Sequence, residues 1–298
     1  MTHDQYAFND PRTRYPSISP PVQQQQEPGI QSKMDPVPDL GETTYRGSGR
    51  LTGRKALITG GDSGIGGAVA IAFAREGADV AISYLPEEEE DAQHIVSQIE
   101  NAGRKAVAFP GDLKDKDYCL ALVDAAVKGL EGLDIVVSNA GKQVYVEKIE
   151  DLSDEQFEET FQTNVFAMFW IIKAAVPHLK PGSTIIATAS LEAYHQLPFL
   201  LDYATTKGAI NNFSKALAQQ LAPRGIRVNA VAPGPTWSAL QVTQGYPPDK
   251  LPEFGKDAPL GRSGQPAELA PAYVFLASGE SSFVVGETLN VNGGTPTP

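Results

Sequence analysis

KALITGGDSGIG, residues 55–66, joins a short apolar run to a turn with glycines at Gly60, Gly64 and Gly66, and a helical pattern follows. A strand, a glycine-rich turn and a helix start in this order direct backbone N–H groups and the helix dipole toward one point, where a pyrophosphate binds well. Gly60 would form the turn, Gly64 would let the backbone approach the phosphates, and Gly66 would let helix and strand pack closely. We therefore expect a nucleotide loop, although a tight turn without a ligand could carry the same glycines.

Asp62 places an acidic side chain inside this loop, where an anion is expected to bind. Its carboxylate is compatible with a bound pyrophosphate only if the side chain turns away or caps the helix N-terminus. We keep Asp62, Ser63 and Ile65 among the candidate contacts of the loop.

The chain after residue 50 repeats the strand-then-helix pattern of this first unit. Short apolar runs predict about seven strands, at 55–59, 79–83, 105–109, 133–138, 183–188, 226–232 and 288–292. Helical stretches are expected between them, at about 64–76, 87–102, 115–130, 153–179, 202–222 and 266–278. Such alternation predicts an α/β fold with a Rossmann-type, doubly wound parallel sheet, which binds ligands at the carboxyl ends of its strands. We expect a single domain at 51–298.

Residues 1–50 differ from the rest of the chain because they are rich in Pro, Gln and Ser, as in PSISPPVQQQQEPG at 16–29. Few large apolar side chains are available there to offset the entropy lost on ordering. Two alternatives remain open: a disordered tail, or an extended arm packed on the core or on a neighbouring subunit. The candidate anchors of such an arm are Tyr15, Ile18, Ile30, Met34, Leu40 and Tyr45.

Composition limits the function of the 298-residue chain. A net charge of −12 and a pI of about 4.8 disfavour binding to nucleic acid and to anionic membrane surfaces. The one cysteine, Cys119, cannot form an intramolecular disulfide, and the four histidines are scattered, so we expect no metal site. No basic-then-apolar N-terminal segment and no long uncharged apolar run is present. We expect a soluble cytoplasmic protein.

Further motifs follow the nucleotide loop in a fixed order. They are NAG at 139–141, Asn164, Ser190, YATTK at 203–207 and PG at 233–234. With TGxxxGIG before them, they make the chain similar to the short-chain dehydrogenase/reductase family. More narrowly, YRGSGRLTGRKALITGGDSGIG at 45–66, YLPEEEEDA at 84–92 and AGKQ at 140–143 resemble a bacterial branch of NAD(P)-dependent aldehyde reductases related to glucose and ribitol dehydrogenases. The similarity covers the chain from about residue 50 to its end, and in that branch it includes the arm.

This resemblance implies a cofactor site that runs along the sheet edge. Asp112 and Leu113 would meet the adenine, the NAG loop would line the cleft, and the segment after Pro233 would hold the nicotinamide carboxamide. The implied cofactor contacts are Gly60, Asp62, Ser63, Gly64, Ile65, Gly66, Ser83, Tyr84, Asp112, Leu113, Asn139, Ala140, Gly141, Tyr203, Lys207, Pro233, Gly234, Thr236 and Ser238.

The resemblance also implies a catalytic tetrad of Asn164, Ser190, Tyr203 and Lys207. A hydride that adds to a carbonyl carbon leaves negative charge on the oxygen, which a tyrosine can protonate. Lys207 is one helical turn from Tyr203, and its ammonium would lower the phenol pKa from about 10 toward working pH while also binding the nicotinamide ribose. Ser190 would orient the carbonyl oxygen, and Asn164 would hold a water that links Lys207 to solvent.

Residues near this centre are candidates for shaping the substrate site. They are Lys142 and Gln143 after NAG, and His195 and Gln196 after the serine, although His195 could equally be an ordinary loop residue. The segment 237–266 is rich in Pro and Gly, which is typical of a mobile lid.

The choice between NAD and NADP usually depends on the residue that ends the second strand, here Tyr84. No Asp selects NAD at this place and no Arg binds a 2′-phosphate. Ser83 could hydrogen-bond a phosphate, whereas the acidic run 87–91 would repel it. We expect a slight preference for NADP(H), with NAD(H) possible.

The favoured function is an oxidoreductase that interconverts a small carbonyl compound and an alcohol. Two alternatives are a dinucleotide-sensing or structural subunit, which would not need the tetrad, and a reductase of acyl chains on a carrier protein. The last would need a basic docking surface, for which only Lys142, Lys250, Lys256 and Arg262 are plausible. The family resemblance also implies a homotetramer built through the long helices at about 115–130 or 153–179 and at 202–222.

Overall fold

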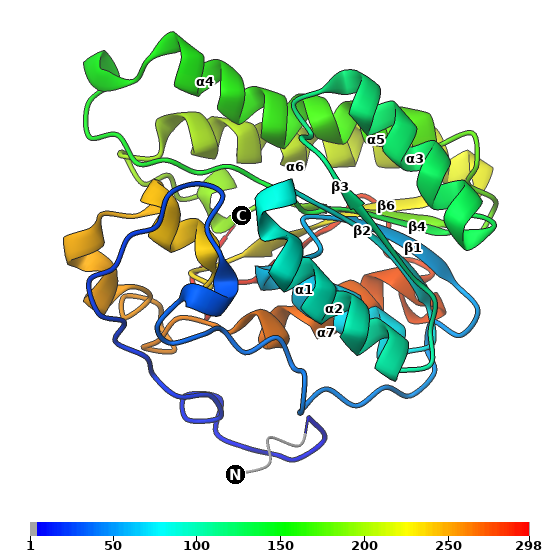
Figure 1. The fold of residues 1–298 in the computed structure, drawn as a ribbon, viewed down its shortest axis with the longest axis horizontal. Coiled ribbons are helices and arrows are strands. Elements are labelled where there is room, and N and C mark those ends of the chain that lie inside the picture. Colours follow the sequence, from blue (N-terminus) through cyan, green and yellow to red (C-terminus); the bar gives the residue numbers. More distant parts are fainter. Residues whose placement is uncertain (1–4, 298) are drawn as a thin grey trace.

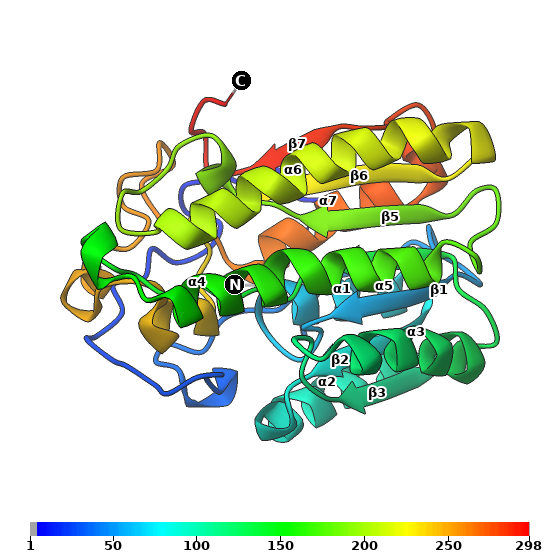
Figure 2. The ribbon, with the colours of Figure 1, turned by 90° about the horizontal axis from the view of Figure 1, so that it is seen from above.

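The computed structural model describes residues 5–297. These residues contain one seven-stranded sheet in the order β3-β2-β1-β4-β5-β6-β7, and every neighbouring pair is parallel (Figures 1 and 2). The strands are β1 Lys55–Thr59, β2 Asp79–Tyr84, β3 Ala106–Pro110, β4 Ile135–Ser138, β5 Thr184–Thr188, β6 Arg227–Pro233 and β7 Thr288–Val291. The order in which successive strands join the sheet changes direction at β1, which lies between β2 and β4. This change of direction confirms the expected doubly wound α/β fold.

The helices cover both faces of the sheet. Figure 1 shows α1, α2 and α7 on one face and α3 to α6 on the other. Their bounds are α1 Gly64–Arg75, α2 Glu89–Asn101, α3 Lys116–Leu130, α4 Asp154–Phe161, α5 Ala167–Ala175, α6 Leu201–Leu221 and α7 Pro266–Ala277.

One expected helix differs from the prediction. The stretch expected as a single helix at 153–179 is divided into α4 and α5 by a π-helical turn at Gln162–Phe166, and α5 ends at Ala175. A π turn accommodates an extra residue and widens the helix locally, which apolar spacing alone does not reveal. Asn164 lies within this turn.

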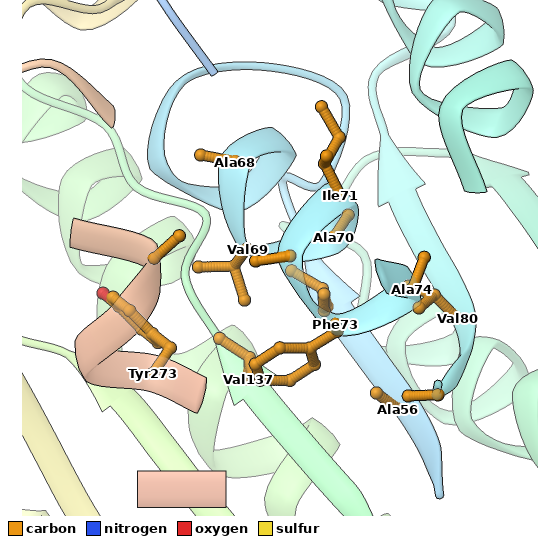
Figure 3. Packing of buried hydrophobic residues seen from close by; sticks show 14 of the residues in the cluster. Ala56, Ala68, Val69, Ala70, Ile71, Phe73, Ala74, Val80, Val137 and Tyr273 are labelled. Atoms are coloured by element: carbon orange, nitrogen blue, oxygen red, sulfur yellow. The ribbon is translucent and has the colours of Figure 1, made fainter. Parts of the chain in front are cut away.

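The core on the α1 face is built from small and branched side chains. Val69 and Phe73 of α1 lie toward Val137 of β4 and Tyr273 of α7 (Figure 3), and all four are fully buried. α1 is rich in alanine and glycine, so it approaches the sheet and α7 closely. This close packing fixes the start of α1, and with it the nucleotide loop.

The arm before β1 is extended and packs on the core of its own chain. Tyr15, Met34, Leu40 and Tyr45 are buried there, whereas Ile18 and Ile30 are partly buried. Met34 joins a separate apolar cluster with Trp237, Ala239, Val242, Leu251 and Phe254. The segment 237–266 therefore has a small core of its own that includes the arm, and its expected mobility stays a prediction.

The end of the arm is tied to Glu76, which follows α1. The fully buried Glu76 carboxylate accepts hydrogen bonds from the Tyr45 hydroxyl at 2.7 Å, from Ser48 N at 2.9 Å and from Arg50 N at 3.0 Å. The Arg50 guanidinium donates to the same carboxylate through Nε at 3.0 Å and Nη2 at 2.6 Å. Burial opposes the charge on Glu76, but these donors outweigh it and lower its pKa to about 2.

Candidate active site

The nucleotide loop has the backbone that its glycines predict. Gly60 and Gly64 have φ values of 59° and 50°, in the left-handed region that favours glycine. A Cβ on Gly66 would lie 1.9 Å from the carbonyl oxygen of Gly60, so no side chain fits there. The loop is therefore folded tightly against the start of α1.

The NAG loop is tied to the nucleotide loop by hydrogen bonds. Thr59 Oγ1 accepts from the backbone N–H groups of Asn139 at 3.0 Å and of Ala140 at 3.1 Å. The Asn139 amide donates to the carbonyl oxygens of Thr59 and Gly60 at 3.2 and 3.1 Å, and its Oδ1 accepts from Thr188 Oγ1 at 3.2 Å. Asn139 thus joins the ends of β1, β4 and β5.

These strand ends border a cavity of about 600 Å³. It is lined by every predicted cofactor contact except Gly66, and by Ser190, Tyr203 and Lys207 of the predicted tetrad. Gly66 and Asn164 lie behind the lining, where Gly66 packs under the loop and Asn164 bonds its neighbours. The sequence motifs therefore meet in one cavity, although the role of each residue stays a prediction.

The end of the cavity near β2 is acidic. Asp62 and Ser83 are buried, and Asp62 Oδ2 and Ser83 Oγ have no hydrogen-bond partner among residues 5–297. Burial raises the pKa of Asp62 to about 6 and that of Glu88 to about 8. The Asp62 side chain neither points to solvent nor occupies the N-cap position, which belongs to Ser63. It faces the cavity with an unused acceptor.

Tyr203 and Lys207 are buried on the first turns of α6. Lys207 Nζ lies 5.3 Å from the centroid of the Tyr203 ring and donates to the Thr188 carbonyl oxygen at 2.8 Å. Burial lowers the Lys207 pKa to about 7 and raises the Tyr203 pKa above its ordinary value, while the Ser190 side chain acts in the opposite direction on Tyr203. The expected lowering of the Tyr203 pKa is thus not present in this arrangement, because desolvation disfavours the phenolate more than the Ser190 hydrogen bond favours it.

Ser190 and Asn164 approach the same centre from β5 and the π turn. Ser190 Oγ accepts a hydrogen bond from Glu192 N at 3.1 Å. Asn164 Oδ1 accepts from Lys142 N at 2.7 Å, and its Nδ2 donates to Lys142 O at 2.9 Å and to Thr206 Oγ1 at 3.0 Å. Asn164 therefore fixes the backbone after NAG and joins it to α6, a role that sequence reasoning did not give it.

The segment after β6 borders the cavity and lies next to the nucleotide loop. A Cβ on Gly234 would lie 2.6 Å from Asn292 Cα, so the chain passes close to the C-terminal strand here. Thr236 Oγ1 donates to Gly234 O at 3.1 Å, and Ser238 Oγ donates to Gln241 Oε1 at 3.0 Å. An ideal Cβ on Gly64 lies 3.2 Å from Ser238 Cβ, which brings this segment against the loop.

The substrate side holds some of the predicted residues and several others. Lys142, Gln143 and His195 line the cavity, whereas Gln196 does not. Tyr246, Phe254 and Asp257 of the expected lid segment 237–266 also line it. Sequence reasoning missed Glu27 and Pro28 of the arm, and also Lys114, Glu192, Leu197, Leu200 and Thr295. Among these missed residues only Leu200 carried a usable signal, because it directly precedes α6.

Comparison with known proteins agrees with this geometry. Residues 60–296 match a family described as enoyl-(acyl carrier protein) reductase. An uncharacterized oxidoreductase of Escherichia coli, YghA, is 60% identical over 96% of this chain and 98% of its own length. The chain belongs to the short-chain dehydrogenase/reductase family. As a member of that family it is an oxidoreductase.

Other relatives have more specific names. A glucose and ribitol dehydrogenase of Daucus carota is 41% identical over 92% of this chain and 96% of its own, and an NADPH-dependent aldehyde reductase of Arabidopsis thaliana is 42% identical over 91% and 96%. A short-chain dehydrogenase from Burkholderia cenocepacia, solved in complex with NADP, superposes with a TM-score of 0.76 at 34% identity and covers 82% of this chain and 98% of its own. These relatives confirm the predicted branch and support the use of NAD(P).

The cavity fits such a dinucleotide. Its loop has glycines that admit a phosphate next to the backbone, and unpaired polar atoms of Asp62 and Ser83 lie at the end where ribose hydroxyls are expected. Among residues 5–297 no group of three or more His, Cys, Asp or Glu side chains is placed to hold a metal ion, and no helix could cross a membrane.

Proposed function

We propose that the protein is an NAD(P)-dependent enzyme that interconverts a small aldehyde, ketone or sugar and the corresponding alcohol. One observation carries this proposal: Ser190, Tyr203 and Lys207 line one cavity together with the nucleotide loop. A substrate in contact with Tyr203 would therefore lie within reach of a nicotinamide bound along the same cavity.

The residues of the chain divide the proton chemistry between them. The cofactor supplies or accepts the hydride. Tyr203 gives its phenolic proton to the carbonyl oxygen during reduction and takes it back during oxidation. Ser190 donates its hydroxyl to the same oxygen and orients it, and Lys207 binds the nicotinamide ribose and stabilises the phenolate once the substrate oxygen has taken the proton. Asn164 holds the chain after the NAG loop against α6. It also positions the water that links Lys207 to solvent.

We propose a slight preference for NADP(H), with NAD(H) also accepted. Ser83 Oγ is a buried hydroxyl with no partner among the described residues and could donate to a 2′-phosphate. Asp62 and Glu88 line the same end of the cavity and would repel that phosphate when ionised. The preference is therefore small.

Two alternative functions have less support. A sensing or structural subunit would have no use for the buried Tyr203 and Lys207 pair. Reduction of acyl chains on a carrier protein, which the name of the matched family suggests, needs free basic residues for docking. Lys142 and Lys256 are paired with Glu27 and Glu253, and Arg262 is buried against Glu268. The basic candidates for a docking surface are therefore largely neutralised.

We also propose a homotetramer that works in the cytoplasm. Phe157, Phe166 and Phe169 are exposed on α4, the π turn and α5, and Phe169 packs edge-on against Phe213 of α6. Such a row of exposed aromatic rings favours association between subunits. Ile172 of α5 and Leu221 of α6 do not belong to this exposed face, because both are buried in the core of the chain. The cytoplasmic location rests on the single, buried Cys119.

Replacement of Tyr203 by Phe tests the function. The variant loses only the transferable proton, so kcat should fall at least a hundredfold while the dissociation constant for the dinucleotide changes less than about twofold. A screen of aldehydes, sugars and polyols with each cofactor, followed by nicotinamide absorbance, identifies the substrate first. Tyr194→Phe is the matched control, because Tyr194 does not line the cavity. A Tyr203→Phe enzyme that keeps more than about a tenth of the wild-type kcat would show that the proton donor is another group.

A further inference from the structure

The arm reaches the cavity through residues 25–31. Glu27 and Pro28 are among the cavity-lining residues, although no motif of the catalytic domain includes them. This segment is the part of the arm where contacts to both sides of the cavity are concentrated.

On one side, Gln31 supports the nucleotide loop. Its Oε1 accepts a hydrogen bond from Gly64 N at 2.7 Å, and only 5% of the residue is exposed. Its own backbone N–H donates to Asp91 Oδ2 of α2 at 2.6 Å, which fixes the residue in place. Gln31 does not line the cavity, whereas Ser63, Gly64 and Ile65 do. The carboxamide therefore holds the loop from behind and leaves the cavity side of the loop open to a ligand.

On the other side, residues 25–31 contact the segment 237–266, which follows β6. Gln25 N donates to Val242 O at 2.8 Å, and the Gln25 side chain closes a turn by bonding Ile30 N at 2.7 Å and Ile30 O at 3.1 Å. Within this turn, an ideal Cβ on Gly29 would lie 2.3 Å from Thr243 Cγ2, so the two segments are in close contact.

A salt bridge joins the arm to the NAG loop. Glu27 Oε2 pairs with Lys142 Nζ, and Lys142 also pairs with Glu159 of α4. The Lys142 side chain is 16% exposed and that of Glu27 is 42% exposed, so water screens the pair only in part. The segment 25–31 thus connects the nucleotide loop, the segment 237–266 and the chain just after the NAG loop, all of which border one cavity.

We propose that the arm segment Gln25–Gln31 forms a wall of the cofactor site, in which Gln31 positions the Gly64 amide and the Glu27–Lys142 pair retains the bound dinucleotide. This inference rests on the proposed function, because it assigns the cavity to a dinucleotide. The physical reason is preorganisation: a loop that is held in its binding conformation before the pyrophosphate arrives loses less entropy on binding.

The experiment uses the full chain and measures the dissociation constant and dissociation rate of NADPH and NADH by the fluorescence of the bound nicotinamide. Gln31→Ala leaves the buried Gly64 N–H without its acceptor, and we expect about tenfold weaker binding and a KM for cofactor raised to match. The kcat at saturating cofactor should fall less than twofold, because the tetrad is not altered. Gln31→Glu keeps an acceptor but adds negative charge behind the phosphate loop, so its affinity should be lower still and should recover in part at high salt.

Glu27→Gln tests the second contact without touching the loop. We expect the dinucleotide to dissociate about threefold faster, with an unchanged melting temperature, because a partly exposed ion pair contributes little to folding. Gln24→Ala is the matched control, since Gln24 is an exposed residue of the same segment, and it should bind like the wild type.

The outcomes separate the two proposals. Wild-type protein that binds neither dinucleotide would overturn the proposed function together with this inference. Wild-type binding with unchanged affinity and dissociation in Gln31→Ala and Glu27→Gln would overturn this inference alone, and so would tighter binding by Gln31→Ala, since the carboxamide would then be competing with the phosphate. If Gln31→Ala does not fold, the dissociation rate of Glu27→Gln decides.

Discussion

Lys207 is a charged group in a place that disfavours charge. It lies 3% exposed on α6, with a carbonyl oxygen as its hydrogen-bond acceptor, and burial lowers its pKa from 10.5 to about 7. A lysine that is kept partly neutral in this way costs folding free energy, as functional groups in active sites often do. The fold tolerates this cost because the rest of α6 packs well against the sheet.

Replacement of Lys207 by Met should therefore stabilise the cofactor-free protein while it damages both turnover and cofactor binding. The unfolded lysine titrates near 10.5 and the folded one near 7, so the penalty is fully present below pH 7 and disappears as the pH rises to 10.5. We expect Lys207→Met to exceed the wild type by about 3 kcal/mol in free energy of unfolding at pH 7, after the loss of one hydrogen bond, and the two to converge near pH 10.

Urea unfolding at pH 7, 8, 9 and 10 measures this difference. Lys215→Met on the exposed side of α6 is the control and should show no such convergence. A Lys207→Met protein that is less stable than the wild type at pH 7 would mean that the lysine contributes to folding.

Single residues of the site could be predicted only where their chemistry requires particular residue types at fixed spacings in the sequence. Gly60, Tyr203 and Lys207 could be singled out because a phosphate loop and a proton donor need those residue types at those spacings, and all three line the cavity. Glu27 and Gln31 could not be predicted. Each contacts a single group far away in the sequence, Lys142 for Glu27 and the Gly64 amide for Gln31, so neither belongs to a motif with a regular spacing. The bonds of Asn164 to Lys142 and Thr206 could not be predicted, because only the packing of the π turn reveals them, and its expected water stays a prediction.

Among the elements, the strands and most helices follow directly from apolar patterns, since β1, β2, β4, β5 and β6 are largely buried on both faces and most helices have one apolar side. The exceptions are the π turn at Gln162–Phe166 and the course of the arm. The arm has little secondary structure, and its attachment depends on individual polar contacts such as the Arg50 and Tyr45 bonds to Glu76. These contacts join residues 26 to 31 positions apart, which local sequence patterns cannot encode.

Glu76→Gln should weaken the attachment of the arm to α1. Removing the buried carboxylate leaves Arg50 with only the more distant Glu280 as an acidic partner, and we expect a loss of about 3 kcal/mol in free energy of unfolding at pH 7. The pKa of Glu76 is about 2 in the folded chain and 4.5 in the unfolded one, so its contribution is present above pH 4.5 and is lost as the pH falls toward 2. The wild type and the variant should therefore converge in acid.

Thermal unfolding between pH 3 and 8 provides the measurement. Glu100→Gln, at an exposed position of α2, should keep the wild-type profile. Equal stability of Glu76→Gln and the wild type at pH 7 would show that the network does not hold the arm.

In the whole molecule, parallel strands bring the motifs to one edge, which explains why predicted contacts that lie between Gly60 and Ser238 in the sequence line one cavity. The doubly wound topology and the place of the site could be predicted because they follow from connection rules that act on the entire chain. The arm could not be placed by such rules. Composition left a disordered tail and a packed arm both open, and the burial of Tyr15, Met34, Leu40 and Tyr45 in the core of the chain favours the packed arm.

Deletion of residues 1–48 tests what this packing contributes. The deletion removes Tyr15, Met34, Leu40 and Tyr45, whose burial yields about 1.5 to 3 kcal/mol each, offset in large part by the entropy that the arm loses on ordering. With a net loss of a few kcal/mol, the melting temperature should fall by about 5 to 10 °C.

Because these anchors are buried within one chain, and the exposed rings proposed for assembly lie on α4, α5 and the π turn, the number of subunits should not change. Light scattering should give a tetramer for both proteins, about 127 kDa for the full chain of 31.8 kDa. Removal of residues 1–9 alone should leave the melting curve unaltered, since those of them that are described are exposed or only partly buried. If the truncated protein has the same melting temperature as the full chain, the arm is dispensable for folding. If it forms dimers or monomers instead of tetramers, the arm also joins subunits.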